Sequence, residues 1–151
     1  MTTGKPTSFI AYAAAIALGV AGLALAVRAF GHDDVAWCRR VFSALAQGQQ
    51  YIQQDIDWDL FRALDSDVGA LYRQLSTDDE KANYRRMFIN RFGEGFRQSK
   101  ARLGDFTNWR LQGRQDEGQL VVAADHVSKS KTVLFTISTI GHRRLQGIQW
   151  Q

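Results

Sequence analysis

An uninterrupted apolar run near the amino terminus constrains this chain more than any other feature. It extends over the 19 residues from Phe9 to Val27, contains no charged side chain and is followed directly by Arg28. As a helix, the run would span roughly 28 Å, close to the thickness of a bilayer's hydrocarbon core. We therefore expect a short tail over residues 1–8, a single transmembrane helix over residues 9–28 and a separate domain over residues 33–151.

A cleavable signal peptide is the alternative interpretation of this run. Lys5 would supply its basic region, and Ala24-Leu25-Ala26 would supply a small-residue cleavage site. The apolar part of a signal peptide typically has about 7–15 residues, which is shorter than the run observed here. The length therefore favours a permanent membrane anchor.

Small residues recur along the apolar run with the spacing of a helix. Steps of three or four place them on one face, while bulkier side chains occupy another. They are Ala11, Ala15, Gly19, Gly22 and Ala26. A smooth face of this kind lets a second helix approach closely, so we expect contact with another integral membrane subunit or with a second copy of the chain. The abundance of alanine in membrane anchors in general is the alternative explanation.

Three residues are expected at the membrane surface, namely Arg28, Phe30 and Trp37. Basic and aromatic side chains favour the head-group region of a bilayer. Lys5 precedes the run, whereas Arg28, Arg39 and Arg40 follow it, and this count slightly favours a domain inside the cell. Arg39 and Arg40 are expected within a folded helix and say less about orientation, and a short amino-terminal anchor with an external domain is a common arrangement. We expect a single-pass protein of a bacterial inner membrane, with its domain slightly favoured in the periplasm.

The charges of the predicted domain are divided between its two halves. Residues 33–80 contain four arginines and ten acidic residues, a net charge of −6, whereas residues 81–151 contain thirteen basic and five acidic residues, a net charge of +8. Helices and sheet can neutralise each other internally, or a basic face can meet anionic lipid or an acidic partner. No recognition motif accompanies the basic residues, so we expect no nucleic-acid partner. The single cysteine, Cys38, excludes an internal disulfide.

Helical spacing and capping residues predict several helices in the first half of this domain. The first begins near Val35, and another is capped by Ser66 or Asp67. Thr77 and Glu80 form a T-x-x-E capping box that begins a long amphipathic helix. One face of this last helix carries four aromatic residues: Tyr84, Phe88, Phe92 and Phe96.

After this helix the apolar pattern changes to the two-residue period of strands. Four strands are predicted, over Phe106–Gln112, Leu120–Val127, Thr132–Ile140 and Leu145–Trp150. Short turns join them, which is typical of an antiparallel meander. We therefore expect an α+β fold in which several helices, preceded by one transmembrane helix, pack on a four-stranded antiparallel sheet.

The order of helices followed by strands such as KTVLFTIST and RRLQGIQW resembles the membrane-anchored members of the NTF2-like and cystatin-like superfamily of cone-shaped domains. The commonest NTF2-like pattern also has a strand pair between its early helices, and we expect no strand between Leu64 and Ser76. The resemblance implies a cone-shaped domain, but the group contains enzymes, ligand carriers and non-catalytic assembly domains alike. Fold therefore does not decide function.

Few residues offer catalytic chemistry. His126 follows Asp125 on a predicted strand, and neighbouring strand residues point to opposite faces, so the two do not form a dyad. If His126 faces inward, it is a candidate general base with Tyr84 or Asp105; an ordinary exposed or hydrogen-bonded strand histidine is the alternative. No spacing matches a zinc, calcium, haem or phosphate site, so we expect neither a metal nor a cofactor.

These patterns predict a non-catalytic accessory or assembly subunit of a larger membrane complex, of the secretion, transport or electron-transfer type. A membrane-tethered binding module for a lipid or another apolar ligand is the alternative, and an NTF2-like enzyme is the third hypothesis. A binding module would line its pocket with helix and strand side chains. The predicted set is Tyr84, Phe88, Phe92, Phe96, His126 and Phe135.

Overall fold

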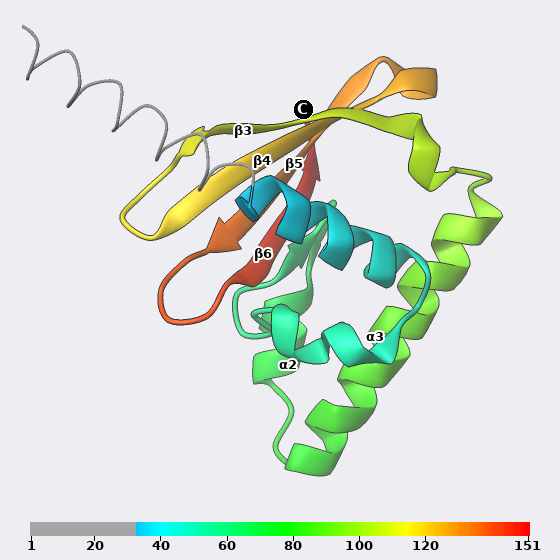
Figure 1. The fold of residues 1–151 in the computed structure, drawn as a ribbon. Helices are drawn as coiled ribbons and strands as arrows, with labels where there is room; N and C mark the ends of the chain where they lie inside the picture. Colours follow the sequence, from blue (N-terminus) through cyan, green and yellow to red (C-terminus); the bar gives the residue numbers. More distant parts are fainter. Residues whose placement is uncertain (1–32) are drawn as a thin grey trace, which may run out of the picture. The chain divides into compact units, whose positions relative to one another are not determined.

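Helices occupy the first half of the described chain and most of the sheet comes from the second half (Figure 1). The computed structural model of the protein describes residues 33–151. A helical segment over residues 33–46 precedes the 3-10 helix η1 (Gln50–Asp55), strands β1 (Arg62–Ala63) and β2 (Ser66–Asp67), and helices α2 (Val68–Arg73) and α3 (Asp78–Gln98). The remaining elements are η2 (Leu103–Asp105), β3 (Phe106–Arg114), β4 (Gln119–His126), η3 (Val127–Lys129), β5 (Lys131–Ser138) and β6 (Arg144–Trp150).

The sheet corrects the predicted architecture. The fold is α+β, but its sheet has six strands in the order β2-β1-β6-β5-β4-β3, and it is mixed rather than wholly antiparallel. Strand β1 runs parallel to β6, with Arg62 opposite Gly147 and Ala63 opposite Ile148. The prediction of a four-stranded antiparallel sheet, and of no strand between Leu64 and Ser76, was therefore wrong.

The additional strands extend the sheet beyond β6. The backbone N–H of Asp57 donates to the carbonyl of Leu145 at 3.0 Å, and that of Leu64 donates to Ile148 at 2.6 Å. Residues from Ile56 onward thus run beside β6 and satisfy backbone groups that an edge strand would leave unpaired. Each added strand has only two residues, which is too short to show an alternating pattern in the sequence.

Helix α3 begins at the predicted capping box. The backbone N–H of Glu80 donates to the Thr77 hydroxyl at 3.2 Å, and the Glu80 carboxylate accepts from the N–H of Thr77 at 3.0 Å. These bonds satisfy amide groups that have no partner inside the helix. The helix that follows has 21 residues and places its aromatic side chains toward the interior.

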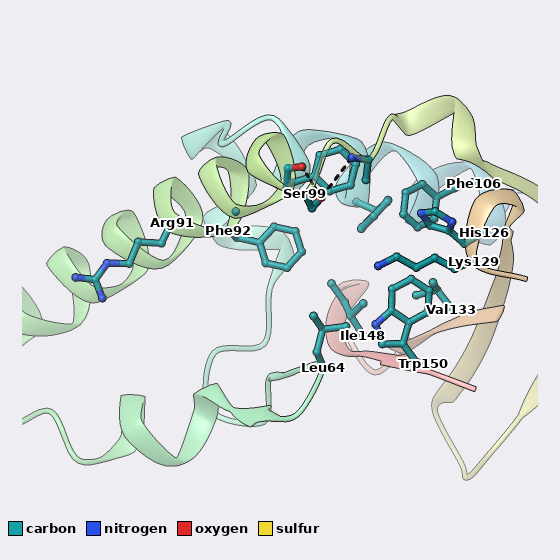
Figure 2. A pocket seen from close by; sticks show the side chains of 14 residues that line it. Leu64, Arg91, Phe92, Ser99, Phe106, His126, Lys129, Val133, Ile148 and Trp150 are labelled. Carbon is teal, nitrogen blue, oxygen red and sulfur yellow. Dashed lines mark hydrogen bonds between the residues drawn. The ribbon is translucent and has the colours of Figure 1, made fainter. Parts of the chain in front are cut away.

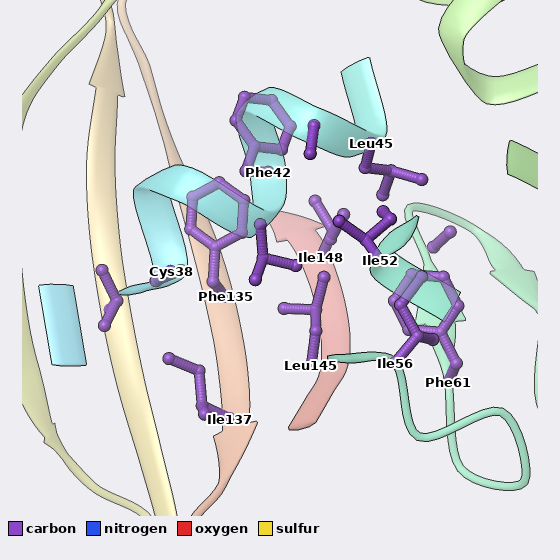
Figure 3. Close-up of a cluster of buried hydrophobic side chains, with 14 of the residues drawn as sticks. Cys38, Phe42, Leu45, Ile52, Ile56, Phe61, Phe135, Ile137, Leu145 and Ile148 are labelled. Carbon is purple, nitrogen blue, oxygen red and sulfur yellow. The ribbon is translucent and has the colours of Figure 1, made fainter. Parts of the chain in front are cut away.

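The core lies between the helical segment 33–46 and one face of the sheet (Figure 3). Phe42 from the segment meets Phe135 of β5 with ring centroids 5.0 Å apart. Cys38 is also buried in this core, and its burial raises the pKa of the thiol above the ordinary range. The strand residues that face this core alternate with residues on the opposite face, as the period-two pattern predicts.

None of the helices within residues 33–151 is long and apolar enough to cross a membrane. The tail predicted over residues 1–8 and the anchor predicted over residues 9–28 lie outside the described residues. The expected helix-packing and membrane-surface positions there are Ala11, Ala15, Gly19, Gly22, Ala26, Arg28 and Phe30. Residues Asp34–Gln151 form one compact unit.

Candidate functional site

A cavity of about 290 Å³ lies between the carboxyl-terminal half of α3 and the sheet (Figure 2). Its walls come from α3, four strands, η3 and the β1–β2 turn. The side chains around it are predominantly apolar. They belong to Phe42, Leu64, Phe92, Phe96, Ala101, Phe106, Val133, Ile148 and Trp150, together with Arg91, Gly95, Ser99, His126 and Lys129.

Aromatic rings hold one wall of this cavity in place. Phe42 contacts Phe106 edge to face with centroids 4.9 Å apart, and it contacts Phe96 at 6.1 Å. Phe96 in turn stacks on Phe106 at 6.1 Å. These three rings come from three different elements and pack on one another, so the wall joins the helical segment 33–46, α3 and β3.

His126 faces inward from the last position of β4. It lies opposite Phe106 in the sheet register, and only 2% of its surface is exposed. Its ring meets Phe106 and Trp150 edge to face, with centroids 4.8 and 5.7 Å apart. Nδ1 is 3.2 Å from the Ser128 hydroxyl, whereas Nε2 is buried and has no hydrogen-bond partner. A buried polar atom without a partner costs free energy, so this nitrogen is a candidate contact for a polar group in the cavity.

Besides His126 and Arg91, the polar side chains of Ser99 and Lys129 line the cavity, and they have different roles. The Ser99 hydroxyl donates to the carbonyl of Phe96 at 2.7 Å and accepts from the N–H of Ala101 at 3.3 Å, so it serves the end of α3. The Lys129 ammonium lies 4.9 Å from the centroid of the Trp150 ring. Lys129 forms no ion pair with another residue in the range 33–151. Its charge is therefore available at the cavity.

The acids considered for His126 are engaged elsewhere. Asp125 points to the opposite sheet face, where its carboxylate lies 3.0 Å from Arg110 and accepts hydrogen bonds from Asn108 and Thr132 at 2.8 and 3.0 Å. Bonds from Asn108, Thr132 and Arg110 lower the pKa of Asp125. Asp105 accepts from the backbone N–H of Arg102 at 2.8 Å. Within residues 33–151, no carboxylate is hydrogen-bonded to His126.

Three of the six residues predicted to line a pocket lie together in the structure. Phe92, Phe96 and His126 line the cavity. Phe88 instead packs edge to face on Trp58 and Phe61 at 5.9 and 5.6 Å.

The other two predicted pocket residues also lie away from the cavity. Tyr84 lies 6.1 Å from the ring of Tyr72, and burial raises the pKa of its hydroxyl. Phe135 is fully buried in the core, stacked on Trp109 at 5.1 Å.

The sequence patterns did not predict several of the cavity residues, among them Lys129, Val133, Ile148 and Trp150. The alternation of β5 and β6 carries a signal for three of them, because Trp150 lies opposite Val133 and Ile148 shares their face. Lys129 belongs to η3, which has no such periodicity. Its position follows only from the fold.

Outside the cavity, Trp37 is the one predicted membrane-surface residue within the described chain. It is half-buried, packs against the core and borders a polar hollow with Asp55 and His142. Among residues 33–151, no cluster of three histidine, cysteine or acidic side chains has the arrangement of a metal site.

Comparison of the chain with protein-family models, with curated proteins and with solved structures found no match.

Proposed function

We propose that this chain is a membrane-tethered binding module that holds an apolar ligand in the cavity between α3 and the sheet. One observation carries the proposal: the cavity is a concave space beside the packed core, lined mainly by aromatic and aliphatic side chains. An apolar concavity with a few convergent polar groups is the usual form of a small-molecule site.

The membrane part of the proposal is supported by the apolar run from Phe9 to Val27. A domain attached to a bilayer meets apolar ligands that are scarce in water but concentrated in the membrane. The tether would therefore raise the local concentration of such a ligand at the cavity. We keep a bacterial inner membrane, with the domain on the periplasmic side, as the proposed location.

The NTF2-like and cystatin-like group remains the proposed superfamily. The β1–β2 hairpin lies between the helical segment 33–46 and α3, where the NTF2-like pattern has its strand pair. The position of this hairpin supports the proposed relationship. Because the group includes carriers, enzymes and assembly domains, the functional proposal depends on the cavity and not on the fold.

The test is photo-crosslinking of the full chain in phosphatidylcholine nanodiscs, with a neutral hexadecanol probe that carries a diazirine on its chain. We expect labelled peptides that contain Phe92, Phe96 or Trp150. Gly95→Leu should abolish this labelling, because a side chain at Gly95 enters open space at the cavity and meets no atom within 4 Å.

Gly113→Leu is the matched control, since Gly113 also has open space but does not line the cavity. It should retain the labelling of the unmodified chain. Equal labelling of the cavity peptides in both variants, or labelling confined to residues 9–27, would overturn the binding proposal.

An assembly subunit is the second candidate function, and the small-residue spacing from Ala11 to Ala26 favours it. Integral membrane subunits, or a second copy of the chain, would then be its partners. Gly19→Leu should abolish co-purification of partners while membrane insertion is retained. Val20→Leu, which changes the bulkier face, should leave co-purification intact; loss in neither variant would count against this function.

A further inference from the structure

The cavity has a polar end, and that end narrows the chemistry of its ligand. His126 and Lys129 both contact the Trp150 ring: the His126 ring centroid is 5.7 Å from the Trp150 centroid, and the Lys129 ammonium is 4.9 Å from it. In Figure 2 the Lys129 side chain lies between the His126 and Trp150 rings, and its ammonium points toward Phe92. A cation and a buried ring nitrogen therefore both lie beside Trp150 at the edge of an apolar space.

We propose that the ligand is an amphiphile with one apolar chain and a carboxylate head group, and this inference rests on the proposed binding function. The chain occupies the space bounded by Phe92, Phe96 and Val133. The carboxylate lies at the polar end, where one oxygen accepts from the Lys129 ammonium and the other from Nε2 of His126. Two protein donors thus match the two oxygens of one carboxylate.

The hydrogen bonding of His126 fits this arrangement. Nδ1 lies 3.2 Å from the Ser128 hydroxyl, which can either donate or accept. When the hydroxyl donates to Nδ1, the ring proton resides on Nε2, and that atom needs an acceptor. No acceptor among residues 33–151 reaches it. A carboxylate oxygen would supply the missing partner after a small shift of the side chains that bury Nε2.

The size of the cavity favours a single chain. Its volume of about 290 Å³ lies at the lower limit of small-molecule sites, which are roughly 300–1,000 Å³. A ligand with two acyl chains would need a larger space. Arg91 also borders the cavity, but in Figure 2 its guanidinium points away from it, so Lys129 is the cation that serves the head group.

The sequence offers a close control for Lys129. Lys131 begins β5 two residues later and is also exposed, but it does not line the cavity. Replacing either lysine with methionine removes one positive charge from the same part of the surface. Only the replacement of Lys129 should change the choice of ligand.

The experiment is competition against the photoreactive hexadecanol probe in the full chain in nanodiscs, with unlabelled hexadecanoate or hexadecanol as competitor. At a pH that ionises the acid, we expect hexadecanoate to compete about tenfold more strongly than hexadecanol, the value of one charge-assisted hydrogen bond. Lys129→Met should remove this preference, and Lys131→Met should keep it. His126→Phe, which retains a ring against Phe106 and Trp150, should weaken it.

The possible outcomes distinguish an error in the ligand's head group from an error in the binding function. If hexadecanol and hexadecanoate compete equally in the unmodified chain, the carboxylate inference is wrong while the binding function stands. A preference that survives in Lys129→Met but disappears in Lys131→Met also overturns the inference. If neither compound competes and the cavity peptides are never labelled, the proposed function itself fails.

Discussion

The two halves of α3 face the interior with the same kind of side chain but meet different surroundings. In the first half, Phe88 packs against Trp58 and Phe61, and Tyr84 lies against Tyr72. We call these five residues the closed cluster. In the second half, Phe92 and Phe96 border the open cavity. One aromatic stripe thus serves as packed core at one end and as the wall of a site at the other.

The difference arises from what each half faces. The chain between η1 and α2 folds back beside β6 and places Trp58 and Phe61 against the first half, and α2 adds Tyr72. The second half faces β4, β5 and β6, whose side chains leave the cavity unfilled. A stripe of aromatic side chains on a helix therefore indicates that this face is turned inward. The element opposite determines whether another side chain packs against the stripe or a cavity remains beside it.

The largest expected difference in stability is between a variant that truncates a ring of the closed cluster and one that truncates a ring at the cavity. Phe61→Ala should lower the free energy of unfolding by about 3–5 kcal/mol, because Phe61 is fully buried in the closed cluster. Phe92→Ala should cost roughly half of that or less, since a half-buried ring that borders a cavity loses fewer contacts. Urea denaturation of the full chain in detergent, monitored by tryptophan fluorescence, measures the loss of unfolding free energy in both variants. Equal losses would contradict the distinction between the two ends.

Two glycines of α3 should respond in opposite directions to the same substitution. A Cβ at Gly93 would lie 2.7 Å from the backbone nitrogen of Gly48, so Gly93→Ala should destabilise the domain by about 1–3 kcal/mol. Gly95 has no atom within 4 Å of that position, and Gly95→Ala should stabilise by about 0.5–1 kcal/mol through helix propensity. The same denaturation measurement checks both signs. A destabilised Gly95→Ala would mean that the cavity end of α3 is more tightly packed than described.

A smaller, pH-dependent effect is expected at the amino terminus of α3. Backbone N–H groups of Thr77 and Ser76 bond the Glu80 carboxylate and lower its pKa from the ordinary value of 4.5. Its contribution to stability is therefore fully present above pH 4.5 and is lost as the pH falls through the lowered pKa. Glu80→Gln should remove this part of the acid dependence of the urea midpoint.

The capping box also tests whether the two halves of α3 behave independently. Because it lies beyond the closed cluster and away from the cavity, Glu80→Gln should leave competition by hexadecanoate unchanged near neutral pH. In Glu80→Gln, hydrogen exchange of the backbone amides should increase first in the amino-terminal turns of α3. Increased exchange around Ser99, with the amino-terminal turns unaffected, would show that the two ends of the helix are not independent.

Local signals in the sequence were sufficient for the elements that local interactions determine. The Thr77–Glu80 box located the start of α3, and alternation located β3 to β6. Strands β1 and β2 had no comparable signal, because two residues cannot show a period. The parallel pairing of Arg62 with Gly147 joins residues that are far apart in the chain, and no local pattern records it.

The candidate site was predictable to a similar extent. Alternation was compatible with an inward His126, and helical spacing placed Phe92 and Phe96 on one face. The same spacing included Tyr84 and Phe88, which only Trp58, Phe61 and Tyr72 distinguish from the cavity residues. The sequence predicted the stripe, whereas the division of that stripe into core and cavity depends on tertiary contacts.

The central claim is that the open end of the aromatic interior is occupied by a ligand in the cell. Mass spectrometry of the full chain, extracted into nanodiscs from the membranes that hold it, tests this most directly. The account predicts a stoichiometric single-chain carboxylate with the unmodified chain and with Gly113→Leu, and none with Gly95→Leu. An empty unmodified chain, or the same bound molecule with Gly95→Leu, would contradict it.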